Sequence, residues 1–351
     1  MGCYNSKIYD KSIITNNFYN LKICTFYIDI SNLFIKENYL DQIINYYFEC
    51  NNEYYIDLLC IQGIEDLYLY NLIINKFNKY LEKNNINKSR KDNLYYYPYI
   101  KNTNNNTLTI WNVSNDTNNI INYNKLVISR YEIICSMEKY YNINNQKNNL
   151  NIHYITIKFY NNLISCCNIN FLEKDTNYDT NIIKFINNTF KMYRAQVDNL
   201  ENNLNNNIER KLYFFCGNIG IKEIQNNKIN TKYSNFIIKL KLLDIFRYIS
   251  GIKNKVDIIK YNYYTNILCY RNTFIFLYID VENNIDYDNY TKISNMIYKK
   301  YGIIIIDSYI DKYMNNIFIN FPTNCIILFD KKWENSKKIN NKSIYKKISF
   351  N

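Results

Sequence analysis

The sequence predicts an α/β fold with one layered core. Apolar runs of strand length alternate along the chain with longer runs whose apolar residues recur at helical spacing. The chain has 351 residues, enough to bury a substantial core, and shows neither an internal repeat nor a stretch typical of an interdomain linker. We therefore expect one α/β domain rather than two small ones.

The first third of the chain predicts two strands and two helices. We expect strands at Lys22–Ile28 and Tyr55–Gln62, separated by a helix around Leu33–Phe48. Asp66 can cap a second helix that ends near Leu81. Asparagine-rich stretches predict surface loops at Asn102–Asn124, Asn142–Asn151 and Asn202–Asn207.

The rest of the chain continues this alternation. Two β-rich runs, His153–Phe159 and Leu163–Phe171, flank a short polar turn and predict a hairpin. Further strands are expected at Lys211–Cys216, Thr273–Tyr278, Gly302–Ser308 and Cys325–Phe329. Helices are expected at Asn181–Leu204, Phe236–Tyr248 and Lys292–Lys300.

Composition permits several kinds of partner. The excess of Asn, Ile, Lys and Tyr is typical of an AT-rich genome, and 39 Tyr with 19 Phe predict an aromatic core. A net charge of +12 is compatible with nucleic acid, phospholipid headgroups or an acidic protein. The densest basic cluster is Lys331–Lys347, with seven Lys and one Glu.

The ten cysteines favour buried, reduced thiols over a disulfide framework or a zinc site, because most lie singly in apolar runs and no CxxC pair occurs. Cys24, Cys60, Cys216 and Cys325 are examples. No apolar run reaches the length of a membrane span, and the N-terminus lacks the apolar core of a signal peptide. We therefore expect a cytoplasmic protein.

The first six residues match the pattern for N-myristoylation. Gly2 follows Met1, Ser6 stands at the expected spacing, and Cys3 is placed to accept palmitate. One acyl chain binds membranes marginally and two bind them stably. We expect lipidation at Gly2 and Cys3, and with it attachment to the cytoplasmic face of membranes; the alternative is an unmodified terminus.

Short segments of the chain resemble motifs of the endonuclease/exonuclease/phosphatase superfamily, which has the deoxyribonuclease-I-like fold. Lys22–Tyr27 (KICTFY) stands where the family has KIxTxN, and Asp57–Gly63 (DLLCIQG) where it has DIIxLQE. Val127–Ile133 (VISRYEI) is closely similar to AILSRYPI. Asn168–Phe171 (NINF) resembles NTHL, and Arg194–Val197 (RAQV) loosely resembles the helical RxxQ pattern.

The resemblance continues to the end of the chain. Gly217–Gly220 (GNIG) resembles GDFN, and Asp244–Arg247 (DIFR) resembles DxFR. Arg271–Phe276 (RNTFIF) is similar to RIDYIF, and Pro322–Ile327 (PTNCII) to SDHxPV. Each match is short, but nine of them occur in the family's order between residues 22 and 329.

This resemblance implies a four-layer α/β sandwich, in which helices flank two central mixed β-sheets and the site lies where strand ends converge. Family members hydrolyse phosphoesters in DNA, RNA, inositol phosphates or sphingolipids with magnesium. In them Asn and Glu hold the metal, an Asp–His pair activates water, and another His and Asn position the phosphate. We expect the family-like domain at residues 21–330, between an N-terminal segment, 1–20, and a basic tail, 331–351.

Every catalytic position that the resemblance transfers is substituted in this chain. The metal-binding Asn and Glu fall on Tyr27 and Gly63, and the histidine of the NTHL motif falls on Asn170. The other positions fall on Asn218, Gly220, Thr273, Thr323 and Asn324. Magnesium prefers anionic oxygen ligands, and an amide cannot act as a base, so no catalysis is expected at these positions. The sole histidine, His153, is expected to be structural.

Two other roles remain open at this edge. Asp29 and Glu65 lie two residues beyond the substituted ligands, on the same strand faces but displaced by about 6.6 Å, and could form a relocated Mg or Mn site. Asn170, Asn218 and Asn324 could instead donate hydrogen bonds to an anion without cleaving it. Asp244 and Arg247 are expected to pair within one helical turn and maintain the fold.

The leading hypothesis is a pseudoenzyme, a phosphoesterase fold kept as a binding or structural module, with a membrane surface or a protein as partner and no cofactor. The alternative is a divergent metal-dependent phosphodiesterase, nuclease or lipid phosphatase with a relocated site. A third hypothesis is a non-catalytic nucleic-acid-binding protein, whose affinity would fall steeply with salt.

Overall fold

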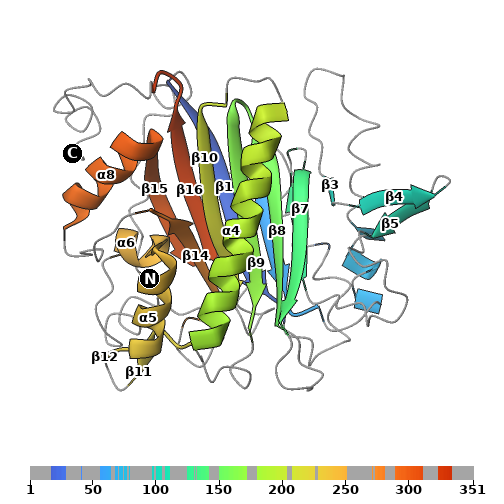
Figure 1. The fold of residues 1–351 in the computed structure, drawn as a ribbon, viewed down its shortest axis with the longest axis horizontal. Coiled ribbons are helices and arrows are strands. Elements are labelled where there is room, and N and C mark those ends of the chain that lie inside the picture. The colour runs from blue at the N-terminus through green and yellow to red at the C-terminus, as the bar shows by residue number, and fades with distance from the viewer. Residues whose placement is uncertain are drawn as a thin grey trace.

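Two six-stranded β-sheets stack face to face in a computed structural model of the chain, with helices on the outside (Figure 1). Both sheets are mixed, since each contains a parallel pair among antiparallel neighbours. The predicted α/β fold with two central mixed sheets is therefore confirmed. The structure describes residues 17–28, 41, 56–64, 68–69, 71–73, 75–76, 79, 97–98, 100–104, 107–110, 125–129, 131, 133–141, 150–171, 180–203, 208–225, 228–250, 271, 273–280, 289–310 and 323–333.

The first sheet has the strand order β15-β16-β1-β2-β6-β3. Strand β1 is parallel to β2 and antiparallel to β16, so segments from both ends of the chain meet at the centre of this sheet. Its strands are β1 (Phe18–Tyr27), β2 (Leu58–Gln62), β3 (Tyr97–Pro98), β6 (Lys125–Ser129), β15 (Ile303–Ile310) and β16 (Thr323–Asp330).

The second sheet has the order β13-β14-β10-β9-β8-β7. Its strands are β7 (Ile133–Tyr141), β8 (Leu150–Phe159), β9 (Asn162–Asn170), β10 (Arg210–Asn218), β13 (Leu242–Asp244) and β14 (Thr273–Tyr278). The predicted hairpin is confirmed as β8 and β9, and Tyr160 takes a positive φ of 51° in its turn. Two small sheets pair β4 (Ile100–Asn104) with β5 (Thr107–Ile110) and β11 (Ile224–Gln225) with β12 (Lys228–Ile229).

Helices α4 (Thr180–Asn203) and α5 (Thr231–Leu240) cover the outer face of the second sheet (Figure 1). Their apolar sides, including Phe190 and Phe236, pack with the outward residues of β8, β9, β10 and β14. Helices α6 (Ile245–Ser250) and α8 (Tyr290–Tyr301) contact β15. Among the helices that the structure describes, none combines the length and the apolar character needed to cross a membrane.

Two predictions from the sequence are wrong. The helix expected over Phe236–Tyr248 is interrupted, because Lys241 adopts the left-handed conformation (φ 55°) and Leu242–Asp244 instead pair with the edge of β14. The loop expected at Asn102–Asn124 contains most of the β4–β5 hairpin, which the local excess of asparagine concealed. The helix predicted around Leu33–Phe48 lies almost wholly outside the described residues.

The two sheets are joined by a polar layer within an otherwise apolar interior. Asn168 of β9 accepts a hydrogen bond from the Gln62 amide of β2 (2.8 Å) and donates to the backbone carbonyls of Ile61 (3.2 Å) and Leu126 (3.1 Å) in the first sheet. Gln62 also donates to the Thr25 hydroxyl (2.9 Å). Asn168, Gln62 and Thr25 are fully buried. Because buried amides are costly without partners, this layer fixes the register of one sheet on the other.

Replacing Asn168 with leucine should lower the free energy of unfolding by about 1–3 kcal/mol, because the Gln62 amide would face an apolar side chain in a dry interior. Urea denaturation measures the loss. The double variant with Gln62→Leu should be less destabilised than the sum of the two single variants, since both polar groups are then removed together. Additive losses would show that the two amides are not coupled.

Candidate functional site

The positions that the resemblance assigns to catalysis gather at one edge of the sandwich, where the last residues of β1, β2, β9 and β10 meet the first residues of β14 and β16. In the first sheet, Tyr27 pairs with Gln62, and Gly63 follows directly. In the second, Asn218 is in register with Asn170 on one side and with Thr273 on the other.

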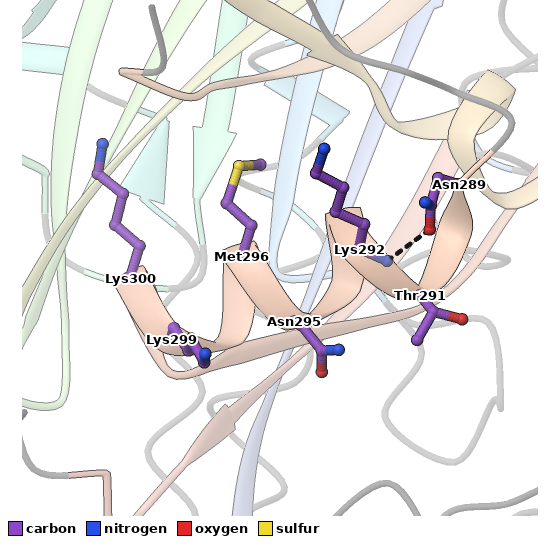
Figure 2. A pocket seen from close by; sticks show the side chains of 7 residues that line it. All are labelled: Asn289, Thr291, Lys292, Asn295, Met296, Lys299 and Lys300. Carbon is purple, nitrogen blue, oxygen red and sulfur yellow. Dashed lines mark hydrogen bonds between the residues drawn. The ribbon is translucent and has the colours of Figure 1, made fainter. Parts of the chain in front are cut away.

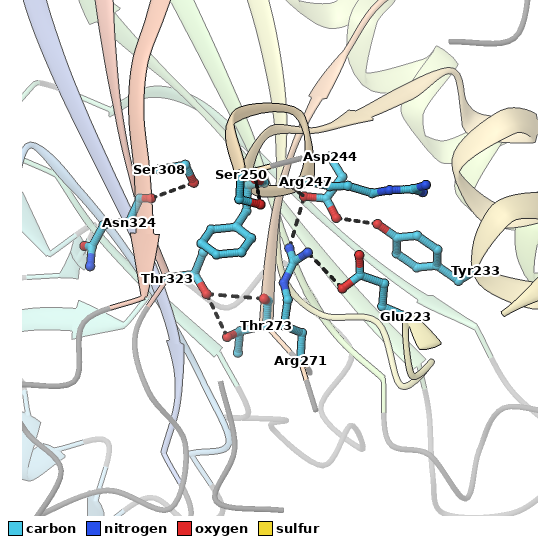
Figure 3. A network of polar contacts seen from close by, with 11 residues as sticks. Glu223, Tyr233, Asp244, Arg247, Ser250, Arg271, Thr273, Ser308, Thr323 and Asn324 are labelled. Atoms are coloured by element: carbon cyan, nitrogen blue, oxygen red, sulfur yellow. Dashed lines mark hydrogen bonds and ion pairs between the residues drawn. The ribbon is translucent and has the colours of Figure 1, made fainter. Parts of the chain in front are cut away.

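A pair of buried hydroxyls joins the two sheets at this edge. The Thr273 and Thr323 hydroxyl oxygens lie 3.2 Å apart, and the Thr323 hydroxyl also lies 3.3 Å from the Thr273 carbonyl (Figure 3). Both threonines are fully buried. Two positions at which the resemblance implies acidic side chains are thus held by neutral groups that bond to each other.

The backbone at Gly63 leaves no room for the glutamate that the resemblance implies there. Gly63 has a φ of +78°, in the region that glycine favours. A Cβ atom at this position would lie 2.3 Å from the Ile28 carbonyl oxygen and 2.9 Å from the Tyr27 ring. The Tyr27 ring therefore occupies part of the space that a side chain at position 63 would need. The conformation of the backbone itself favours glycine at this position.

The three asparagines expected to contact an anion do not all converge. Asn170 and Asn218 are neighbours on adjacent strands, and the Asn218 side-chain oxygen accepts a hydrogen bond from the Gly220 backbone nitrogen (2.8 Å). Asn324 follows Thr323, so strand alternation turns its side chain to the other face of the first sheet (Figure 3). Asn324 is 3% exposed, and its carboxamide has no hydrogen-bond partner among the residues that the structure describes.

A buried arginine next to this edge forms ion pairs with the nearby acidic side chains. Arg271 donates from Nη1 to Glu223 (2.9 Å) and from Nη2 to Asp244 (3.0 Å), and the Tyr233 hydroxyl donates to the other Asp244 oxygen (Figure 3). Burial works against the charged guanidinium, but the two carboxylates raise the pKa of Arg271 above its ordinary value. These carboxylates are thus bound within the protein.

This network changes the roles expected for the DxFR-like segment. Asp244 accepts a hydrogen bond from the backbone nitrogen of Arg247 (3.1 Å), so the two residues do meet within one helical turn. The ion pair found for the Asp244 carboxylate, however, is with Arg271. Arg271 is the first residue of the RIDYIF-like segment. Its position next to a buried strand was the sequence feature that could have indicated a buried ion pair. Sequence reasoning missed Glu223 as its second partner.

The remaining sequence predictions for site residues lie outside the described residues. These are the relocated metal ligands Asp29 and Glu65 and the lipidated residues Gly2 and Cys3. They remain predictions.

A separate basic surface lies on α8. A cavity of about 760 Å³ is lined by Lys292, Lys299 and Lys300 together with Asn289, Thr291, Asn295 and Met296 (Figure 2). The part of its lining that the structure describes carries three lysines and no acidic side chain. The cavity lies on a different element from the substituted strand ends.

The only histidine lies beside the polar layer and is partly buried. His153 is in register with Asn168 on one side and Glu138 on the other. Burial lowers the pKa of His153 to about 4, while Glu138 raises it and Lys125 of the first sheet lowers it further. Burial likewise lowers the pKa of Lys125 to about 7. His153 is therefore neutral near pH 7, which agrees with a structural role.

Replacing Gly63 with alanine should destabilise the protein by at least about 1–3 kcal/mol, the cost of forcing a side chain into this backbone conformation. Denaturant titration measures the change. The double variant Tyr27→Leu/Gly63→Ala should stay destabilised, because it relieves the contact with the ring but not the one with the Ile28 carbonyl. Wild-type stability in the single variant would contradict this description of the edge.

Protonation of His153 should weaken the fold as the pH falls. The folded pKa of about 4 lies below the ordinary value of 6.5, so the unfolded chain binds the proton first and stability is lost between pH 6.5 and pH 4. The loss should approach about 2–3 kcal/mol relative to His153→Gln. Unfolding free energies of both proteins across this window measure it, and parallel pH profiles would refute it.

Comparison with known proteins gives matches only among solved structures. No model of a protein family matches the sequence, and no curated protein matches it. An endonuclease/exonuclease/phosphatase family protein from Leptotrichia buccalis matches over 87% of this chain and 98% of its own, with a TM-score of 0.43 and 14% identity.

Two further structures give similar values. TDP2 of D. rerio, complexed with a single-stranded DNA product, matches over 88% of this chain and 98% of its own, with a TM-score of 0.46 and 9% identity. The human Nocturnin catalytic domain with bound sulfate matches over 89% and 96%, with a TM-score of 0.46 and 11% identity. At low sequence identity, the chain thus matches structures of the endonuclease/exonuclease/phosphatase fold along 87–89% of its length.

Proposed function

We propose that this chain is a non-catalytic protein with a phosphoesterase-like fold, acting as a binding or structural module. The observation that carries the proposal is the closed edge at Gly63. The backbone there excludes a carboxylate side chain, and Tyr27 covers the space beside it. A magnesium ion held as the sequence resemblance implies would have no ligand from either position.

The second sheet supports the same conclusion. Hydrolysis of a phosphoester with metal-activated water needs a base and groups that position the phosphate. The corresponding positions carry Asn170, Asn218, Thr273 and Thr323, which are neutral. The nearby carboxylates of Glu223 and Asp244 are bound by a buried arginine and cannot approach a substrate without breaking that ion pair. Binding without turnover is the chemistry that these residues support.

The relocated site is the alternative that an experiment must separate from this proposal. We expect no turnover of duplex DNA, single-stranded RNA or phosphoinositide by the purified full chain, with either magnesium or manganese, because the described residues of the edge provide neither ligand nor base. A known phosphoesterase added to a parallel sample controls for inhibition, and circular dichroism confirms folding. Turnover that persists through purification and disappears in Glu65→Gln or Asp29→Asn would establish a relocated site instead.

A reconstruction variant sharpens this test. In Tyr27→Asn/Gly63→Glu, the two side chains that the resemblance implies as metal ligands are restored. We expect this variant to remain inactive and to be less stable than the wild type, because the new Cβ at position 63 meets the Ile28 carbonyl. If it gained metal-dependent activity, side-chain identity and not the chain path would explain the lost chemistry.

A further inference from the structure

Three cysteines distant in sequence meet in the interior between the two sheets. Cys60 lies on β2, Cys166 on β9 and Cys216 on β10. Their sulfur atoms all lie within 4.8 Å of one another, and those of Cys60 and Cys166 are 3.2 Å apart. All three side chains are buried. One thiol from the first sheet thus faces two from the second.

The surroundings of this thiol cluster are apolar. It belongs to the hydrophobic core that includes Leu58, Phe214 and Ile275. Cys325 contributes a further buried thiol to the same core. Within the described part of the chain, this is the group of histidine, cysteine and acidic residues whose ligand atoms are close enough to share one metal ion.

The three thiols are close enough to hydrogen-bond to one another. Burial raises the pKa of Cys166, but hydrogen bonds from Cys216 and Cys60 lower it, with a net result of about 5. Burial and the neighbouring thiol raise the pKa of both Cys60 and Cys216. Because the three sulfur atoms already face one another, a cation at the centre of the cluster would take the place of the thiol protons.

We propose that Cys60, Cys166 and Cys216 form a three-thiolate site for one thiophilic metal ion, Zn(II) or Cu(I), which ties the two sheets together. Thiolates are the ligands that select these ions. A metal–sulfur distance of about 2.3 Å places the three sulfurs of a planar site about 4 Å apart, within the range that the cluster already spans. Each thiol that coordinates the ion loses its proton to the solvent.

Burial dictates how the site would fill. No ligand atom is open to solvent, so the ion enters while the sheets assemble and then remains trapped. The test therefore begins with the full chain unfolded under a reductant that is not a thiol. The chain is refolded with Zn(II) in one arm and Cu(I) in the other, freed of loose metal with a weak chelator, and analysed for metal by mass spectrometry.

The wild type should retain about one ion per chain in at least one arm, and the arm that does so identifies the metal. Cys60→Ala, Cys166→Ala and Cys216→Ala should each lose it. Cys167→Ala is the matched control, because its equally buried side chain lies on the opposite face of the same strand, packed with the α4 side, and should leave retention unchanged. Retention in all the variants would overturn the proposal.

A second measurement holds even where an alanine variant does not fold. X-ray absorption of the metal-loaded wild type should show sulfur alone in the first coordination shell. A shell of nitrogen or oxygen would overturn the proposal. So would a folded wild type that keeps no ion in either arm, or that carries a Cys60–Cys166 disulfide under these reducing conditions.

Discussion

The rest of the structure depends on the hydrogen bonds of the Asn168 carboxamide, because they join the second sheet to the first. The carboxamide bonds to the side chain of β2 and to the backbones of β2 and β6. Apolar side chains can slide past one another with little penalty, but a buried amide loses its partners when the sheets shift. The polar layer therefore fixes which residues of the two sheets face each other. These include Cys60 and Cys166 on its inner side and Thr273 and Thr323 at the edge.

The edge shows how the path of the backbone can exclude a side chain from a position that the resemblance assigns to a metal ligand. At most of the positions compared, only the side chain differs from the one that the resemblance implies, and a single substitution would supply it. Gly63 is different, since its positive φ and the Ile28 carbonyl exclude any side chain. A strand end that turns in this way can still close the sandwich and support Tyr27, but it cannot present a ligand toward the second sheet.

Most strands could be predicted because each is a local apolar run, as in Thr273–Tyr278, whose bounds are found as expected. The break at Lys241 could not, because nothing local distinguishes a left-handed lysine from the helical residues around it. The thiol cluster was also hidden, since its members are separated by 50 residues or more and lack any CxxC spacing. Register between sheets is a tertiary property, and a pattern along one strand does not reveal it.

Strand β9 shows how the interior is graded from apolar to polar. Its successive inward residues are Ile164, Cys166, Asn168 and Asn170. Ile164 belongs to the apolar core, Cys166 faces the Cys60 thiol and Asn168 faces the Gln62 amide. The inward side chains of β9 therefore become more polar toward the edge. None of the positions compared at that edge carries a free carboxylate. Among the described residues of the edge that were compared, a hard cation finds no anionic oxygen, whereas a soft cation finds three sulfurs two layers deeper. The same strand that ends in a neutral edge thus supplies the most distinctive donor group of the interior.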